Sequence, residues 1–431
     1  MRNIVICCDG TGNEISENIS NVLKLYRCLR KTDRTEPRQL VFYDPGVGTL
    51  ARPNPWRKLL QDANAIFGLA TGYGLDDKVL ASYAFLVQHY REGDQIYLFG
   101  FSRGAYTVRV LAGLIHKIGL VSPEQVNLAG SGLTSYKQFS SDNQPGLSLE
   151  LNALTDGGSD SEGPLPANKD DQAAQFARIL STRWPTIRFV GVWDTVASVI
   201  VPRADRFYLP SLEELAFTIV NPSVQTFRQA ISIDERRCMF RLKKWEDPQT
   251  YKHNRFNDAH AEPQDILQVW FAGVHADIGG GYPERESGLS KYPLLWMIDE
   301  ATKCGLTVNQ ATVNQLAWGV PRKGSPFSYV EPDVRGDLHT SLSGPWWLLE
   351  YLPKSATYKE WPARKVHFGY YIPHAEPRLI PDGAWIHESA LQRMDALPSY
   401  RPVNLPKHYE TSPMPIPPAH ASAEPEAEAA D

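Results

Sequence analysis

A serine lies between two glycines at the end of an apolar run, in the sequence Gly-Phe-Ser-Arg-Gly. This G-x-S-x-G pattern is typical of a nucleophile elbow, a sharp strand-to-helix turn that exposes the serine hydroxyl, here that of Ser102. The flanking glycines remove Cβ atoms that would clash in so tight a turn. Because a serine hydroxyl is a weak nucleophile at neutral pH, it requires an imidazole to accept its proton and a carboxylate to orient that imidazole.

An acid and a histidine follow the serine in the order that such a site requires. Asp194 comes directly after the apolar run Ile187–Trp193, and His275 comes directly after the run Ile266–Val274. A serine, an acid and a histidine in this order, each at the end of a strand, are typical of hydrolases with a nucleophile elbow. The pattern therefore predicts an acyl-transfer triad of Ser102, Asp194 and His275, with no metal and no cofactor.

The sequence leaves alternatives for the partners of the serine. Asp277, two residues after His275, either orients that histidine or caps the following turn, and in both cases it supports the site. His387 is the alternative base, because it follows an apolar residue and opens a helix-like run. His275 is thus the predicted base and His387 is its competitor.

Acyl transfer also requires backbone N–H groups that stabilise the developing oxyanion. We expect one donor from Arg103, which directly follows the serine. Gly10 and Thr11, in the loop after the first apolar run, are the candidates for the second donor, because the glycine allows close backbone approach. Asp9 is expected to brace that loop.

The elements that must position these residues alternate along the chain. Apolar runs typical of buried parallel strands are Asn3–Cys8, Gln39–Tyr43, Ile96–Phe99, Ile187–Trp193 and Ile266–Val274. Helical patterns lie between them, at Ile19–Arg30, Leu75–Tyr90, Ala105–Ile118 and Gln172–Leu180. This alternation predicts an α/β fold with a mostly parallel sheet and helices on both faces. All the residues proposed for chemistry follow strands, so they should gather at the carboxyl edge of the sheet.

Composition changes along the chain suggest its domain organisation. We predict a catalytic core over residues 1–282, with a flexible insertion over 131–171 that is rich in Gly, Ser, Asn and Asp. Residues 283–411 are rich in Trp, Pro and Tyr and are expected to form a C-terminal extension packed on the core. The Pro/Ala/Glu-biased residues 412–431 are expected to form a disordered tail. Residues 50–74 combine an apolar helical face with glycines and are a candidate lid.

The overall composition excludes several classes of protein. The 431 residues carry a formal net charge of −5 without a basic stripe, which argues against nucleic-acid binding. Five cysteines show neither disulfide nor zinc-ligand spacing, which is typical of a protein folded in a reducing compartment. The N-terminus lacks a secretory signal and no apolar run has the length of a membrane span, so we expect synthesis in the cytoplasm.

Five motifs in order give the chain a family resemblance: CCDGTGN, YDPGVGT, YLFGFSRGAYTVR, VGVWDTVAS and GVHADIGGGY. Together they resemble the DUF2235 family of α/β hydrolases, which includes the Tle1-type phospholipase effectors of bacterial type VI secretion. The resemblance spans residues 1–282. It implies an α/β-hydrolase-like fold and a serine hydrolase that uses Ser102, Asp194 and His275. For effector members it implies cleavage of membrane phospholipids, export by a type VI system, and a secretion-apparatus or immunity protein as a partner.

The residues are also compatible with other functions. A soluble cytoplasmic esterase acting on small acyl substrates would use the same triad. A hydrolase fold that serves only for binding, with an idle serine, is the non-enzymatic alternative. Replacement of Ser102 by alanine separates these classes, because a binding protein would lose nothing.

Overall fold

A computed structural model provides the fold of this protein. It describes residues 1–10, 18–46, 74–142, 171–196, 200–202, 210–212, 215–356, 359–362 and 364–418. The candidate lid at 50–74 lies outside these residues except for Gly74, which precedes the helix α3 (Leu75–His89). None of the described helices combines the length and the apolar character needed to cross a bilayer.

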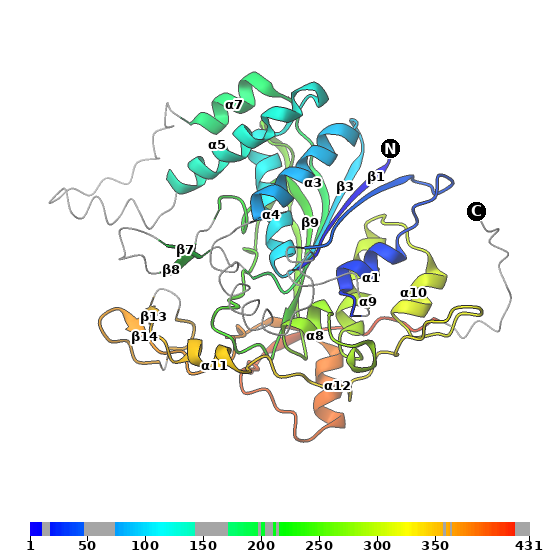
Figure 1. The fold of residues 1–431 in the computed structure, drawn as a ribbon, viewed down its shortest axis with the longest axis vertical. Coiled ribbons are helices and arrows are strands. Elements are labelled where there is room, and N and C mark those ends of the chain that lie inside the picture. Colours follow the sequence, from blue (N-terminus) through cyan, green and yellow to red (C-terminus); the bar gives the residue numbers. More distant parts are fainter. Residues whose placement is uncertain are drawn as a thin grey trace, which may run out of the picture.

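One large sheet organises the molecule and confirms the predicted α/β fold (Figure 1). Its eight strands all pair in parallel. In spatial order they are β16 (Tyr409–Ser412), β15 (Ala384–His387), β12 (Asp265–Phe271), β9 (Val224–Ser232), β6 (Ile187–Trp193), β3 (Gln95–Phe101), β1 (Asn3–Cys8) and β2 (Gln39–Asp44). The strands β1 and β6 have the bounds that their apolar runs predict.

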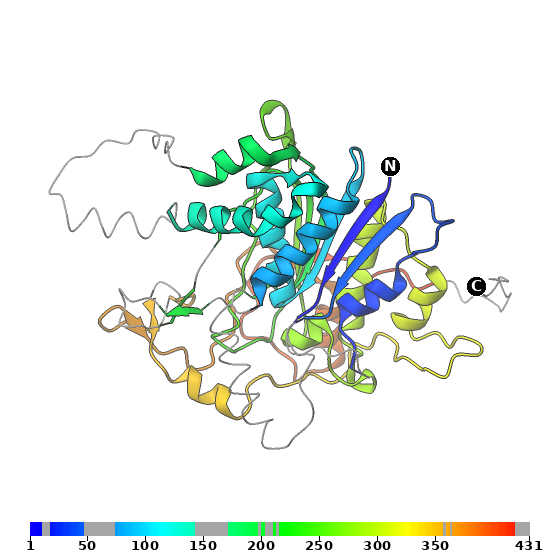
Figure 2. The same cartoon turned by 45° about the horizontal axis from the view of Figure 1, so that its top comes forward.

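Helices cover both faces of the sheet, because the side chains of each strand alternate between two cores. Ile4 and Ile6 of β1 join one core, whereas Val5 joins the other. The first face carries α3, α4 (Arg103–Ile118), α5 (Ala129–Asp142) and α7 (Gln172–Leu180). The opposite face carries α1 (Asn21–Cys28), α9 (Lys291–Lys303) and α10 (Gln310–Leu316), as the two views of Figures 1 and 2 show.

Shorter elements complete the described part of the chain. Four two-stranded ribbons are β4 (Leu120–Val121) with β5 (Ser181–Arg183), β7 (Ile200–Pro202) with β8 (Pro210–Leu212), β10 (Thr250–Asn254) with β11 (Asn257–Pro263), and β13 (Lys354–Ser355) with β14 (Tyr370–Tyr371). The remaining helical segments are η1 (Pro123–Leu128), α8 (His275–Gly279), η3 (Glu284–Glu286), α11 (Pro345–Glu350) and α12 (Glu388–Ala396).

The C-terminal segment adds strands to the sheet. β15 pairs with β12, and β16 pairs with β15, so residues after 283 extend the same sheet as the core. The expected disordered tail begins within β16, and Met414 packs against the core while its N–H donates to Glu388. Residues 419–431 lie outside the described residues.

The expected flexible insertion also begins as ordered structure. Residues 131–142 belong to α5, whose Leu133 and Tyr136 are buried against the core, and the Tyr136 hydroxyl donates to the Ala216 carbonyl. These two side chains, at i and i+3, lie on one face of the helix and pack it against the core. The many polar residues around them make this apolar face hard to recognise in the sequence. The rest of the insertion, 143–170, lies outside the described residues.

The turn from β3 into α4 is tightly packed against the neighbouring strand β1. A Cβ atom added to Gly104 would lie 2.1 Å from the Cys8 carbonyl oxygen, and one added to Gly100 would lie 2.4 Å from the Gly104 carbonyl oxygen. Backbone cannot give way as a flexible side chain does, so both positions require glycine. The elbow therefore depends on this contact between α4 and the end of β1.

We predict that Gly104→Ala destabilises the fold by on the order of 1–3 kcal/mol or more, the usual cost of forcing extra volume into a packed site. Gly130→Ala is the matched control, because its added Cβ meets no atom within 4 Å and it lies on an exposed helix position. That variant should gain up to about 1 kcal/mol. Urea unfolding followed by circular dichroism measures both, and equal stability of the two variants would contradict the packing argument.

Candidate active site

Ser102 occupies the turn between β3 and α4 with an unusual backbone conformation. Its φ is 57° and its ψ is −121°, values that residues with a Cβ rarely adopt. The turn is held in place because the Ser102 N–H donates to the Trp193 carbonyl at 3.1 Å, and the Tyr106 N–H donates to the Ser102 carbonyl at 3.3 Å. Strained residues that are held in this way concentrate at functional sites.

The structure brings the three predicted residues into one hydrogen-bonded chain. His275 Nε2 lies 2.8 Å from Ser102 Oγ, and His275 Nδ1 lies 2.5 Å from Asp194 Oδ2. With Nδ1 protonated and facing the carboxylate, Nε2 is left to accept the serine proton. The three residues come from the ends of β3 and β6 and from the first residue of α8 after β12. They converge because parallel strands end at the same edge of the sheet.

Asp194 is completely buried and its carboxylate is surrounded by donors. The Ser232 N–H donates to Oδ1 at 3.0 Å, and the Arg378 guanidinium contacts both oxygens, with Nη2 3.0 Å from Oδ2. Burial alone would raise the pKa of Asp194, but the charge of Arg378 and the hydrogen bond from His275 lower it well below its usual range. Asp194 is therefore an ionised carboxylate held at fixed orientation.

His275 lies in an apolar cage with charged groups at its backbone. Its ring contacts Phe101 and Phe240 at centroid distances of 4.7 and 4.9 Å, and its N–H donates to Glu235 Oε2 at 3.2 Å. Burial lowers the pKa of His275 below its usual value, against the opposing effect of Asp194. A neutral imidazole at neutral pH is the form that can accept a proton from serine.

Glu235 is itself held as a buried anion. Burial would raise its pKa, but the hydrogen bonds and the charge of Arg237 lower the pKa of Glu235 to about 2. The Arg237 Nη2 to Glu235 Oε2 distance is 2.9 Å. The Ser341 hydroxyl donates to the same carboxylate, so Glu235 links the start of α8 to the chain before α11.

Asp277 and His387 lie in positions that make them partners of other groups. Asp277 Oδ2 accepts from the Val274 N–H at the start of α8, and its Oδ1 lies 2.7 Å from His339 Nδ1. His387 caps α12 through Ser389 and stacks on Phe271 at 4.4 Å. Burial lowers the pKa of His387 to about 3. The contact with Ser102 therefore belongs to His275.

Asp9 and Gly10, which directly follow β1, are the part of the predicted oxyanion loop that the structure describes. Asp9 accepts from the Gly10 N–H at 2.7 Å and from the Tyr43 hydroxyl at 2.9 Å. In this structure the Gly10 amide is therefore used by Asp9, and Thr11 lies outside the described residues. Arg103 begins α4 directly after the serine, so its backbone N–H lies at the helix N-terminus, which favours negative charge. The position of Arg103 at the start of α4 is consistent with the predicted role of its N–H as an oxyanion donor.

Two residues of this site escaped the sequence analysis. Arg378 lies 184 positions after its partner Asp194, and Glu235 lies beyond the end of a strand that the apolar pattern does not reveal. Neither residue belongs to a local motif that would single it out. Within the described part of the chain, no group of three or more His, Cys, Asp or Glu side chains is placed to hold a metal ion.

Residues 2–300 match the model of a family described as T6SS phospholipase effector Tle1-like, catalytic domain. This match covers more than half of the chain. The chain belongs to this Tle1-like family. The match confirms the resemblance inferred from the five motifs, and it ends before Arg378 and the strands β15 and β16.

Other proteins are similar to this Tle1-like chain over part of their length. An uncharacterized protein of Saccharomyces cerevisiae is 30% identical over 246 residues, which cover 56% of this chain and 32% of that relative. A crystal structure of an uncharacterized protein from Pseudomonas aeruginosa is 18% identical with a TM-score of 0.35, covering 72% of this chain and 47% of that one. A Tle1 effector bound to the VgrG spike of the type VI secretion system is 16% identical with a TM-score of 0.32, covering 67% and 52%. The chain thus spans about a third of the yeast relative's length and about half of each solved chain.

We predict that His275 titrates below its ordinary pKa of about 6.5. Histidine ¹³C NMR of the wild type, with the signal assigned from a His275→Ala spectrum, measures this value directly. Asp194→Asn should lower the pKa further, because the carboxylate favours the charged imidazole. A His275 titration midpoint at or above 6.5 in the wild type would contradict the conclusion that burial in the apolar cage is the main influence on its pKa.

Proposed function

We propose that this chain is a serine hydrolase that cleaves the carboxylic esters of membrane phospholipids, an A-type phospholipase activity. The observation that carries the proposal is the continuous contact from Ser102 Oγ through the His275 ring to the Asp194 carboxylate. Membership of the Tle1-like phospholipase effector family supports the same reaction class. The family description also supports delivery by a type VI system, with a component of the secretion apparatus as a partner.

The geometry supports a two-step acyl transfer. Ser102 Oγ attacks the ester carbonyl while its proton passes to His275 Nε2, and the carbonyl oxygen becomes an oxyanion. The bond to the leaving alkoxide then breaks, and the alkoxide takes the proton from His275 to leave as the lysolipid. Water next attacks the acyl-serine while His275 accepts its proton, and His275 returns this proton to Ser102 Oγ as the acyl–oxygen bond breaks and the fatty acid is released. Asp194 remains ionised throughout and stabilises the imidazolium that forms in each step.

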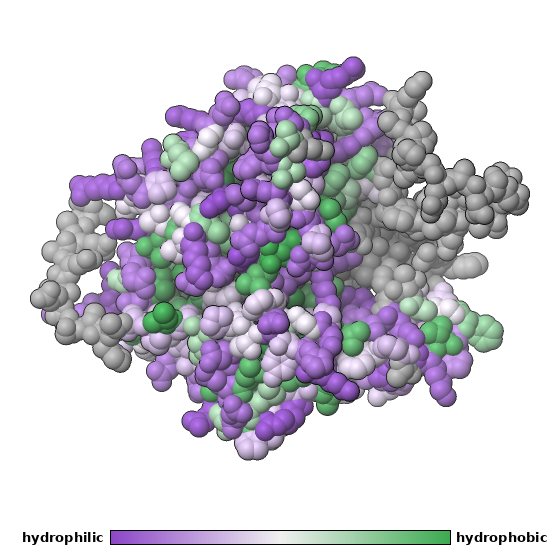
Figure 3. Space-filling model, turned by 180° about the vertical axis from the view of Figure 1, so that it is seen from behind, coloured by the Kyte–Doolittle hydropathy of each residue, from purple (hydrophilic) through white to green (hydrophobic). Residues whose placement is uncertain are grey.

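An exposed apolar surface beside the site supports a substrate within a lipid bilayer. It consists of side chains from α11 and from the chain around β14, and we call it the α11–hairpin surface: Trp347, Leu348, Tyr351, Leu352, Val366, Phe368, Tyr370 and Ile372. Phe368 is fully exposed. Figure 3 shows hydrophobic residues beside hydrophilic ones at the end of the molecule where this hairpin projects in Figure 1. Exposed aromatic and aliphatic side chains that gather on neighbouring segments are typical of a membrane or protein contact.

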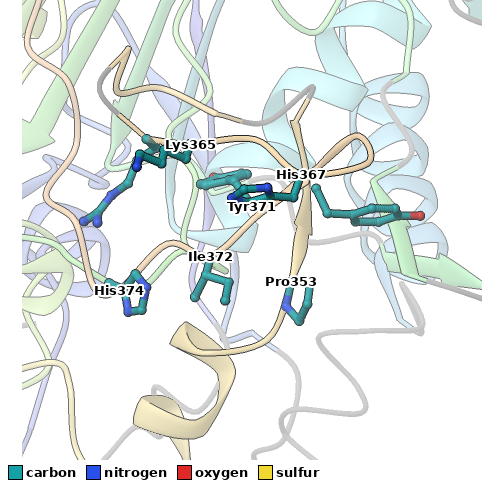
Figure 4. Close-up of a pocket in the computed structure, with 8 residues that line it drawn as sticks. Pro353, Lys365, His367, Tyr371, Ile372 and His374 are labelled. Atoms are coloured by element: carbon teal, nitrogen blue, oxygen red, sulfur yellow. The ribbon is translucent and has the colours of Figure 1, made fainter.

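A cavity of about 460 Å³ adjoins this surface and contains groups that suit anionic lipid headgroups. Lys365, His367 and Tyr371 line one side of it, whereas Pro353, Ile372 and His374 line the other (Figure 4). Arg364 also lines the cavity and pairs with Glu376 at 2.6 Å. Cationic groups next to exposed apolar side chains are the combination that binds an anionic bilayer surface.

Aromatic contacts connect the α11–hairpin surface to the catalytic histidine. Phe240 packs edge-on against both His275 and Trp346, at centroid distances of 4.9 and 5.3 Å. Trp346 precedes the exposed Trp347 on α11, and Glu350 at the end of that helix accepts from the Cys238 N–H at 2.7 Å. A bilayer bound at this surface would therefore lie next to the loop that carries Phe240. This proximity favours lipid over a small soluble ester as the substrate.

We predict that Ser102→Ala abolishes the release of fatty acid from phosphatidylglycerol-containing vesicles. Asp194→Asn and His275→Ala should each lower kcat on the order of 10³-fold or more, because the three residues act as one unit. Mass spectrometry of the lipid products measures all three variants. His387→Ala is the control, and turnover that survives in His275→Ala but is lost in His387→Ala would assign the base to His387.

We also predict that the double variant Leu348→Ser with Phe368→Ser binds these vesicles at least ~10-fold more weakly. Each apolar side chain that leaves water contributes roughly 1.5–3 kcal/mol when fully transferred, so two losses suffice for that change. The control is Ile179→Ser with Phe327→Ser, a pair of the same kind, one aliphatic and one aromatic, that is also exposed (69% and 65%) but lies on other parts of the molecule. Vesicle co-sedimentation measures binding, and turnover of p-nitrophenyl butyrate in solution should stay near wild type in both.

Equal binding by the two double variants would rule out the α11–hairpin surface as the membrane contact. A wild type that hydrolyses the soluble ester but neither binds nor cleaves vesicles would favour the soluble esterase instead. A wild type and a Ser102→Ala variant that are both inactive, yet both bind vesicles, would favour a binding protein.

A further inference from the structure

We propose that Arg378 is a positioning residue of the active site, which fixes the orientation of the Asp194 carboxylate and offsets part of its charge. The proposal rests on the serine-hydrolase function proposed above. It also means that the segment matched to the catalytic family, residues 2–300, is completed by an arginine from the C-terminal part of the chain.

The contact between Arg378 and Asp194 has the geometry of a two-pronged ion pair. Nη1 contacts Oδ1 and Nη2 lies 3.0 Å from Oδ2, so the planar guanidinium faces both carboxylate oxygens. Such paired contacts fix the plane of the carboxylate as well as its position. Because Oδ2 is also the acceptor for His275 Nδ1, the plane that Arg378 sets determines the direction of the bond that orients the imidazole.

The arginine is itself held from several directions. Its Nη2 donates to the Phe240 carbonyl at 2.7 Å, and its own carbonyl accepts from Asn404 Nδ2 at 3.0 Å. Asn404 Nδ2 also donates to the Ile233 carbonyl just after β9. Arg378 is 5% exposed, so its charge has little access to water and depends on the carboxylate. These contacts make Arg378 a rigid part of the site.

The charge of Arg378 has a consequence for the base. The charged groups that act on His275 are Asp194 at Nδ1, Glu235 at the backbone N–H and the nearby Arg237. The neutral Ser102 hydroxyl contacts Nε2, and Phe101 and Phe240 pack against the ring. Asp194 favours the protonated imidazole, and a second cation on the same carboxylate opposes that effect. Arg378 therefore keeps His275 neutral, and able to accept a proton, down to a lower pH.

Two substitutions separate the charge from the two-pronged geometry. Arg378→Gln removes both, so kcat should fall at least ~10-fold and the acid limb of kcat/KM should move upward by at least about half a pH unit. Arg378→Lys keeps the charge but contacts the carboxylate as a single point, so kcat should fall while the acid limb stays near its wild-type position. The kcat/KM of p-nitrophenyl butyrate hydrolysis, measured against pH, gives both quantities.

Arg393→Gln is the matched control for lost stability. Arg393 is also a buried arginine in the C-terminal part, where Nη1 donates to the Val334 and Gly336 carbonyls. Its replacement should lower Tm without moving the acid limb. If Arg378 has a purely structural role, Arg378→Gln should likewise lower Tm without moving the acid limb. That result would overturn the proposal. If Arg378→Gln does not fold, wild-type kcat/KM in Arg378→Lys at every pH would equally overturn it.

A readout that needs no turnover separates this proposal from the proposed function. The His275 pKa, followed by NMR, should rise in Arg378→Gln even in a protein that hydrolyses no tested ester. An unchanged His275 pKa in Arg378→Gln would contradict the role of Arg378. If the pKa rises but the wild type is as inactive as Ser102→Ala, only the hydrolase function is rejected.

Discussion

A single buried negative charge, that of Asp194, is the constraint on which the rest of the site depends. An ionised carboxylate without contact to water costs several kcal/mol unless donors surround it. Here the donors come from three separate parts of the chain: the Ser232 N–H at the end of β9, His275 at the start of α8, and Arg378 in the C-terminal segment. The carboxylate thus connects segments that lie far apart in the sequence. The contact with His275 serves both groups: the carboxylate gains a donor, and the imidazole gains the acceptor that orients it.

The parallel sheet supplies the frame in which this charge can be buried. Strands β3, β6 and β12 end at one edge and deliver the serine, the aspartate and the histidine within hydrogen-bonding distance. The backbone strain at Ser102 persists because Gly100 and Gly104 allow α4 to lie directly against the end of β1. Asp194 has a positive φ of 40° as well, so two of the three residues occupy conformations that the surrounding packing must hold.

The sequence predicts this frame where local patterns suffice. The mainly apolar runs of β1 and β6, and the amphipathic pattern of α7, reproduce their observed bounds. The central strand β9 was missed because it contains Arg228 and Gln229, which read as polar although both are buried. Arg228 pairs with Glu300 and Asp265, and Gln229 accepts from Arg109. Such buried polar side chains find their partners only in the folded chain.

The limits of the sequence analysis at the site have the same origin. Ser102, Asp194 and His275 each follow an apolar run, so their order and position reveal them. Arg378 follows no strand and no motif, and its role depends on a contact across 184 positions. The short strand β15 likewise depends on pairing with β12, and β16 depends on pairing with β15, not on any pattern of their own. Long-range contacts of this kind, and not local propensity, define the C-terminal half of the site.

Ser102 is proposed to be an activated nucleophile, and covalent labelling tests that role most directly. A fluorophosphonate probe reacts with a serine whose hydroxyl proton is accepted by a neighbouring base. Peptide mass spectrometry of the labelled wild type should find the phosphonyl adduct on Ser102, with the adduct lost in His275→Ala and retained in His387→Ala. A folded wild type that leaves Ser102 unmodified, or that is labelled equally well without His275, would contradict the account.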